Sequence, residues 1–189
     1  MKKLRLHGAR WLTGFCLLLL AGCEKAQNPM AADESVATAE AMLDAFYSFD
    51  AAALAQRLAG VAEADTVLYY QAWAKAANYR IQTRRPCTTE DDSTLICAVT
   101  VTDDFGQTLG YVATDTFTLS FENHQLVSVL FEGDDPPVFS ELFVWIGANQ
   151  PAVITGPCKD MFQGGETPAG CARAVVTAAR QFVAVASEQ

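Results

Sequence analysis

An alternation of apolar and polar residues in the middle of the chain limits the fold more than any other feature. In residues 94–103 every second side chain is apolar, and the same period of two recurs in residues 110–121. This period predicts strands at about 79–87, 94–103, 110–121 and 125–132, separated by the turn-forming segments TTEDDS, DFGQ and ENHQ. The strands therefore form an antiparallel meander with one face turned toward a core.

Helical spacing of apolar residues flanks these strands on both sides. Before them we expect a helix over residues 36–47, a second over 51–59 capped by Asp50, and a third over about 65–78. After them we expect a helix between Pro136 and Pro151, and a final one over about 168–186. The order of three helices, a curved meander and two more helices predicts an α+β fold.

This order resembles the NTF2-like superfamily, with YYQAWAKAANYRI leading into the strands and DTFTLSFENHQLVSVLFE as the closing hairpin. The resemblance covers about residues 36–135 and implies a cone, in which a strongly curved sheet wraps around N-terminal helices and encloses a pocket. Members bind apolar molecules there, isomerise or hydrolyse them with a carboxylate, or keep the pocket closed. Asn123-His124 replaces the usual glycine of the last hairpin turn. Residues 136–189 are expected to be a helical extension packed on the same domain.

The first 23 residues have the features of an export signal. Four basic residues precede a run of twelve mainly apolar ones, which as a helix would reach about 18 Å and is too short for a hydrocarbon core of roughly 30 Å. Leu20-Ala21-Gly22-Cys23 then resembles the bacterial lipobox. The resemblance implies cleavage after residue 22, a diacylglycerol on the Cys23 thiol and a further acyl chain, such as palmitate, on its amine. The alternative is an ordinary signal peptide whose cleavage site contains a cysteine.

Removal of residues 1–22 would leave one domain with a large negative charge. Residues 23–35 are polar and are predicted to tether the lipid to the domain. The mature chain would hold nine basic and twenty-two acidic residues, a net charge of −13. This charge argues against nucleic-acid binding, so the expected membrane contact is through the lipid alone. Because Glu24, not Asp, follows Cys23, the expected location in a Gram-negative cell is the outer membrane, facing the periplasm.

Four cysteines remain once Cys16 and Cys23 are set aside. An even number in an exported chain predicts disulfides, and three pairings are available. The local pairing, Cys87 with Cys97 and Cys158 with Cys171, is favoured because each pair brackets one short turn-rich segment. The competing use is metal binding, but no CxxC motif occurs and His124 is predicted to lie in a turn. The sequence therefore predicts neither a metal site nor a cofactor.

The expected strand register brings three charged residues together. If Asn123 and His124 are the central turn residues, Asp115 lies opposite Glu132. If Cys87 faces Cys97, Arg85 lies opposite Val99, which an adjustment at DFGQ can place beside Asp115. Arg85, Asp115 and Glu132 would then form a polar patch on the inner face of the sheet.

Two interpretations of this patch stay open. One carboxyl could have a raised pKa and serve as a general acid or base toward a ligand. Alternatively, both carboxylates lie at the solvent-exposed end of the sheet, neutralised by Arg85. The side chains of Tyr47, Tyr69, Trp73 and Phe117 could line a pocket or form ordinary core. No catalytic group is identified, because a single histidine in a turn cannot serve a serine or cysteine triad.

Two functions follow as expectations. The first is a non-enzymatic envelope lipoprotein whose cone binds a small apolar ligand or a protein partner. The second is a lipid-anchored isomerase or hydrolase that uses Asp115 or Glu132.

Overall fold

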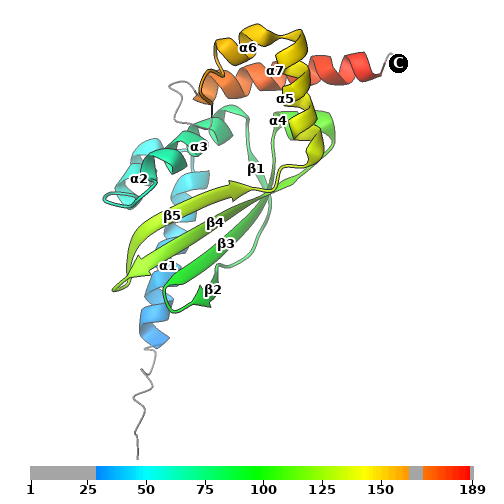
Figure 1. Ribbon diagram of the computed structural model, residues 1–189. Coiled ribbons are helices and arrows are strands. Elements are labelled where there is room, and N and C mark those ends of the chain that lie inside the picture. The colour runs from blue at the N-terminus through cyan, green and yellow to red at the C-terminus, as the bar shows by residue number, and fades with distance from the viewer. Residues whose placement is uncertain (1–28, 162–167, 188–189) are drawn as a thin grey trace, which may run out of the picture.

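The protein has three helices, then a sheet, then a C-terminal group of helices (Figure 1). The computed structural model describes residues 29–161 and 168–187, with side chains from residue 33 onward. The helices are α1 (Pro29–Tyr47), α2 (Ala51–Arg57), α3 (Ala64–Ala76), α4 (Asp104–Leu109), α5 (Pro137–Asn149), α6 (Pro151–Thr155) and α7 (Pro168–Ala186). The strands are β1 (Arg80–Arg84), β2 (Thr88–Asp91), β3 (Thr94–Thr102), β4 (Ala113–Glu122) and β5 (Gln125–Gly133).

The strands form one antiparallel five-stranded sheet. The order is β1-β3-β4-β5, and β2 pairs with β3 beside β1. The α+β class expected from the sequence is therefore confirmed. The period of two also has its expected cause: odd-numbered residues of β3 and β4 are buried, while most even-numbered ones are partly exposed.

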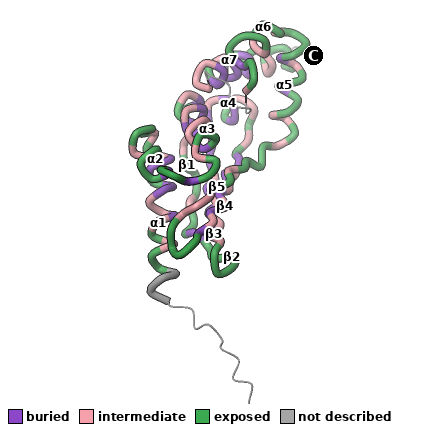
Figure 2. Tube along the Cα trace, turned by 60° about the vertical axis from the view of Figure 1, so that its left-hand side comes forward, coloured by how far each residue is buried: buried purple, intermediate pink, exposed green. Residues whose placement is uncertain are grey.

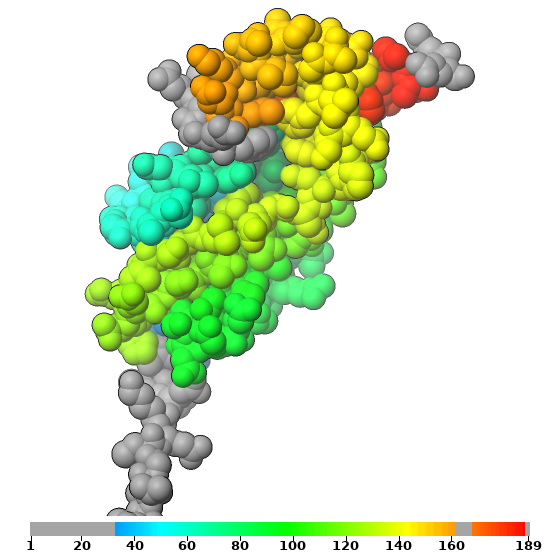
Figure 3. Space-filling view, viewed as in Figure 1, coloured from blue at the N-terminus to red at the C-terminus, as the bar shows by residue number. Residues whose placement is uncertain are grey.

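The helix α1 crosses the inner, odd-numbered face of the sheet. Its residue Glu40 accepts a hydrogen bond from the Cys87 backbone at 2.8 Å, and Tyr47, at its end, contacts Asp115. The opposite face is left open, as the space-filling view of the strands shows (Figure 3). α1 also begins at Pro29, so residues 29–35, at the end of the predicted tether, are helical. Helix-favouring Ala and Glu residues in this stretch account for the earlier start.

The predicted strand 79–87 is shorter than expected, and an additional strand follows it. β1 ends at Arg84 and β2 begins at Thr88, with Pro86 between them. Proline lacks the N–H that a continuous ladder needs, which explains the break. Part of TTEDDS is therefore strand β2 and not loop.

A register shift between Ser120 and Phe121 alters the last hairpin. Phe121 pairs with Leu126 as expected, but beyond the shift the partner of Asp115 is Gly133 and the partner of Thr116 is Glu132. A bulge adds one residue to one strand, and a slip of one residue moves a side chain to the other face. The predicted pairing of Asp115 with Glu132 was therefore wrong.

The connection between β3 and β4 contains a helix where the sequence predicted a turn. Asp103 caps α4 by accepting a hydrogen bond from the Gly106 N–H at 2.5 Å, and Gly110 ends the helix with φ 81°. Phe105 of this helix is buried at 1% exposure. α4 thus carries an apolar side chain out of the sheet toward the C-terminal helices.

The C-terminal helices α5–α7 pack on α3 and α4 and form a second core. The first core lies between α1 and the sheet and includes Phe46, Phe117 and Leu119. The second combines Trp73 and Phe105 with apolar residues of α5 and α7, and Figure 2 shows buried stretches in both regions. The short helix α6 was not predicted, because Pro151 opens a new helix in addition to ending the previous one.

Each core contains one disulfide. Cys87 is bonded to Cys97 in the first, and Cys158 to Cys171 in the second. The local pairing expected from the sequence is confirmed.

Within the described part of the chain, no helix has the length and apolar character needed to cross a membrane. The predicted signal peptide (1–22), Cys23 and residues 24–28 lie outside the described residues.

Candidate functional site

Aromatic rings occupy the space between α1 and the inner face of the sheet. The Phe46 ring centroid of α1 lies 5.1 Å from that of Phe117 on β4 and 5.7 Å from that of Phe131 on β5. Tyr70 of α3 adds a contact of 4.4 Å to Phe131. Offset and edge-to-face contacts of this kind stabilise a packed core. The region in which the resemblance implies a pocket therefore holds the chain's own side chains.

Asp115 lies buried at one end of this aromatic cluster. It is only 2% exposed, and the Tyr47 hydroxyl donates a hydrogen bond of 2.7 Å to its Oδ2 atom. Burial raises the pKa of Asp115 to about 7, although the bond from Tyr47 opposes this rise. Burial also raises the pKa of Tyr47 far above its usual value, and the neighbouring Asp115 carboxyl adds to the rise. The pair can therefore hold a proton on the carboxyl near neutral pH.

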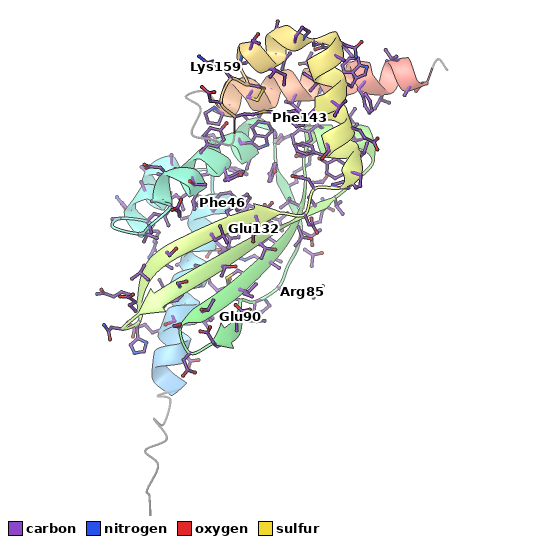
Figure 4. The ribbon with its side chains drawn as sticks, in the orientation of Figure 1. Phe46, Arg85, Glu90, Glu132, Phe143 and Lys159 are labelled. Carbon is purple, nitrogen blue, oxygen red and sulfur yellow. A yellow bond between two sulfur atoms is a disulfide. The ribbon has the colours of Figure 1, made fainter. Side chains whose placement is uncertain are left out.

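The other two members of the predicted patch lie elsewhere. Glu132 pairs with Thr116 and is exposed on the outer face. Arg85 is exposed after the end of β1, at the opposite edge of the sheet from Glu132, and both side chains are labelled in Figure 4. The predicted polar patch of Arg85, Asp115 and Glu132 does not form. The pairing with β3 shifts by one residue between β2 and β1, and the pairing of β4 with β5 shifts between Ser120 and Phe121.

Arg84, not Arg85, lies opposite Val99. Val99 does pair with Asp115, as the sequence predicted. The Arg84 guanidinium contacts Glu40 at 2.5 Å and Asp44 at 2.6 Å, so it fastens α1 to the sheet. This arginine is engaged by the helix rather than by Asp115.

The aromatic candidates fall into three places. Tyr47 and Phe117 lie together beside Asp115, with ring centroids 6.2 Å apart. Trp73 belongs to the second core, where its ring contacts Phe105 at 6.2 Å. Tyr69 is partly exposed on α3 beside Tyr70. The spacing of residues along a helix shows which of them share a face, but not which element that face will contact. The sequence therefore could not show that these four aromatic residues lie in three separate places.

A second buried carboxyl, that of Asp103, was not among the predicted site residues. It is 5% exposed, and burial raises its pKa to about 7 while the bond from Gly106 opposes the rise. The sequence did contain a signal, since an aspartate between a strand and a glycine-containing segment is typical of a helix N-cap. This signal was not used, because a turn rather than a helix was predicted at DFGQ.

Three tyrosines and these two carboxyls form a row between the two cores, which we name the polar seam. It consists of Tyr47, Asp115, Tyr79, Asp103 and Tyr111. Tyr79 packs against both cores, and burial raises its pKa, with Asp115 and Asp103 adding to the effect. The Tyr111 hydroxyl is buried and has no hydrogen-bond partner among the described residues.

Two surface hollows lie near the C-terminal half of the molecule. One, of about 370 Å³, lies beside the seam and is lined in part by Thr102, Gly106 and Tyr111. The other, of about 410 Å³, is lined by residues of α6 and the following turn, including Cys158 and Lys159. Both are open to solvent, so neither provides the enclosed surroundings of a substrate pocket.

The described residues contain no group of three or more His, Cys, Asp or Glu side chains arranged to hold a metal ion. What the seam offers chemically is a buried carboxyl, that of Asp115, which accepts a hydrogen bond from the Tyr47 phenol. Comparison of the chain with protein-family models, with curated proteins and with solved structures gave no match.

Proposed function

We propose that the protein is a lipid-anchored envelope protein whose NTF2-like domain acts by binding a protein partner. The observation that carries this proposal is the aromatic cluster of Phe46, Phe117, Phe131 and Tyr70, which occupies the concave side of the sheet. A domain that fills its own interior interacts through its surface. The three N-terminal helices and the antiparallel sheet with α1 on its inner face support the NTF2-like assignment.

The two disulfides indicate an oxidising compartment outside the cytoplasm. Within that compartment we place the protein on a membrane, outer-membrane anchored in a Gram-negative cell, through acyl chains on Cys23. Mass spectrometry of the N-terminal peptide tests this directly. Cys23→Ala is expected to abolish the lipid mass and release the protein from membranes, whereas Cys16→Ala leaves both unchanged. A membrane-bound, unlipidated wild-type protein would contradict the anchor.

The open face of the sheet is the surface we assign to the partner. On β3 and β4 its side chains are uncharged apart from Glu122 at the hairpin end of β4: Thr94, Ile96, Ala98, Thr100, Thr114, Thr116, Thr118 and Ser120. Leu130 of β5, which pairs with Thr118, is 50% exposed on the same face. Glu122 at the end of β4 and Glu132 on the edge strand β5 are charged residues of this face. On a chain with a net charge of −9, the uncharged short side chains between them are where another protein can approach with least repulsion.

Photo-crosslinking in cells tests this surface. A photoreactive amino acid at Thr116 or Leu130 is expected to give one discrete adduct, and the same residue at Gln56, exposed on α2, none. Equal adducts at all three positions, or none at Thr116 and Leu130, would exclude the sheet face as the partner surface.

Asp115 favours a second candidate, a hydrolase or isomerase that uses this carboxyl. Its burial beside Tyr47 and its pKa of about 7 suit a general acid or base. Native mass spectrometry of the purified protein distinguishes the candidates. A co-purified small molecule that is lost in Asp115→Asn, but kept in Glu132→Gln, would favour the second candidate over the first.

A further inference from the structure

The segment between β3 and β4 joins the two cores of the molecule. It leaves the sheet at Asp103, forms α4 and returns through Tyr111 to β4. Its Phe105 ring lies 6.2 Å from Trp73 of α3 and 5.5 Å from Phe139 of α5. We name residues 103–112 the clasp, because these aromatic contacts connect the sheet to the C-terminal helices, which also pack on α3.

Ionisable groups of the polar seam lie at both ends of the clasp. Asp103 stands at its start, where it holds the first turn of α4 through the Gly106 N–H. Tyr111 stands at its end, with a buried hydroxyl that no described residue binds. Asp115 follows three residues after the clasp and is held by Tyr47 of α1. A change in the charge of Asp103 or Asp115 would therefore affect the packing of the clasp at one of its two ends.

The groups that face these two carboxyls provide little compensation for a negative charge. Asp103 is surrounded by Tyr79, Tyr111 and the acidic residues Asp104 and Asp135, with Arg80 as the opposing cation. The Arg80 Nη1 atom, however, binds Asp104 at 3.1 Å, and its buried Nε and Nη2 atoms have no partner among the described residues. Facing Asp115 are Tyr47, Tyr79, Asp103, Asp134 and Asp135.

Solvent reaches this region from one side. The hollow of about 370 Å³ is lined by residues of the clasp itself, Gly106, Gln107, Gly110, Tyr111 and Val112, together with Thr102 and Gln82. Opening of the clasp toward this hollow would hydrate Asp103, which begins the clasp, and would bring water toward Asp115, which lies at the edge of the first core beside Tyr47.

We propose that the clasp is a proton-controlled connection, which holds the C-terminal helices on the sheet while Asp103 and Asp115 are protonated and loosens when they ionise. An ionised carboxyl in the closed seam lacks water, whereas in the opened seam it is hydrated. Ionisation therefore favours the opened form. This device operates whatever the protein binds, and it goes beyond the proposed function.

Hydrogen exchange measured by mass spectrometry at pH 5 and pH 8, corrected for the intrinsic pH dependence of exchange, tests the clasp. Between the two pH values, protection of amides in residues 103–112 and in α7 is expected to fall by up to about a hundredfold for each carboxyl, which is about tenfold for each pH unit below pH 7. The β3–β4 ladder near Cys97 is expected to keep its protection.

Three variants of the full chain complete the test. Asp103→Asn can still cap α4, and together with Asp115→Asn it is expected to keep the pH 5 protection at pH 8. The control Glu132→Gln, on the outer face, is expected to behave as the wild type. The proposal is overturned by pH-independent protection of the clasp, by an equal loss over the whole sheet, or by a double variant that responds to pH as the wild type does.

Discussion

At the scale of single residues, the seam shows that the free-energy cost of a buried polar group depends on whether it has a hydrogen-bond partner. Asp115 and Tyr47 satisfy each other, whereas the buried Tyr111 hydroxyl has no partner among the described residues. Removing one partner of a buried pair leaves the other unsatisfied, which costs more than the bond itself contributes. Removing a group that has no partner leaves no other group unsatisfied, so this free-energy cost does not arise.

The same substitution is therefore expected to have opposite effects at these two tyrosines. Tyr47→Phe should lower the free energy of unfolding by about 1–3 kcal/mol, because Asp115 loses its donor. Tyr111→Phe should leave that free energy unchanged or raise it by up to about 1 kcal/mol. Urea denaturation at pH 8 measures both. A loss in Tyr111→Phe equal to that in Tyr47→Phe would contradict the assignment of partners.

At the scale of elements, α4 depends on a glycine for its close contact with the seam. A Cβ atom on Gly106 would lie 2.9 Å from the Asp103 Oδ1 atom and 3.2 Å from the Tyr111 carbonyl oxygen. The cap and the return of the chain toward β4 both need that space. Gly147 in α5 is different, since nothing lies within 4 Å of a Cβ atom there.

Alanine at these two positions should separate a packing requirement from helix propensity. Gly106→Ala is expected to lower the free energy of unfolding by about 1–3 kcal/mol, because the cap or the backbone must shift. Gly147→Ala should raise it by about 0.5–1 kcal/mol, since alanine favours a helix. Thermal and urea denaturation give both values. Equal effects of one sign would show that the contacts at Gly106 do not limit α4.

At the scale of the whole molecule, two separately cross-linked cores meet at a seam that contains two buried carboxyls. The folded state raises the pKa of Asp103 and of Asp115 to about 7, from a usual value near 3.8. A raised pKa means that the folded state holds more protons than the unfolded state between these values. The stability that these groups contribute is therefore complete below about pH 4 and is lost as the pH rises through about 7.

The free energy of unfolding is accordingly expected to fall between pH 4 and pH 7, by up to about 1.4 kcal/mol per pH unit for each carboxyl. Asp115→Asn should remove its share of this slope, and Glu132→Gln should leave the slope as it is. Chemical denaturation at intervals of half a pH unit measures the slope. A wild-type stability that rises over this interval would show that the seam carboxyls are ionised in the folded protein.

The sequence by itself determined the features that depend on neighbouring residues. The period of two in β3 and β4, the Asp50 cap of α2 and the local disulfides follow from short-range geometry, and all three were predicted. Asp115 was also assigned to the inner face, because its strand keeps a regular alternation up to that point.

Only the tertiary structure decided which of these residues meet. One bulge at Ser120 moved Glu132 to the outer face, and the break at Pro86 exchanged Arg85 for Arg84. A shift of a single residue leaves the local pattern of a strand almost unchanged but reverses its faces, so no count along the chain reveals it. The seam likewise joins residues from α1, from β4 and from the segments just before β1 and on either side of α4. The protonation of its carboxyls depends on burial that only the packing of these segments creates.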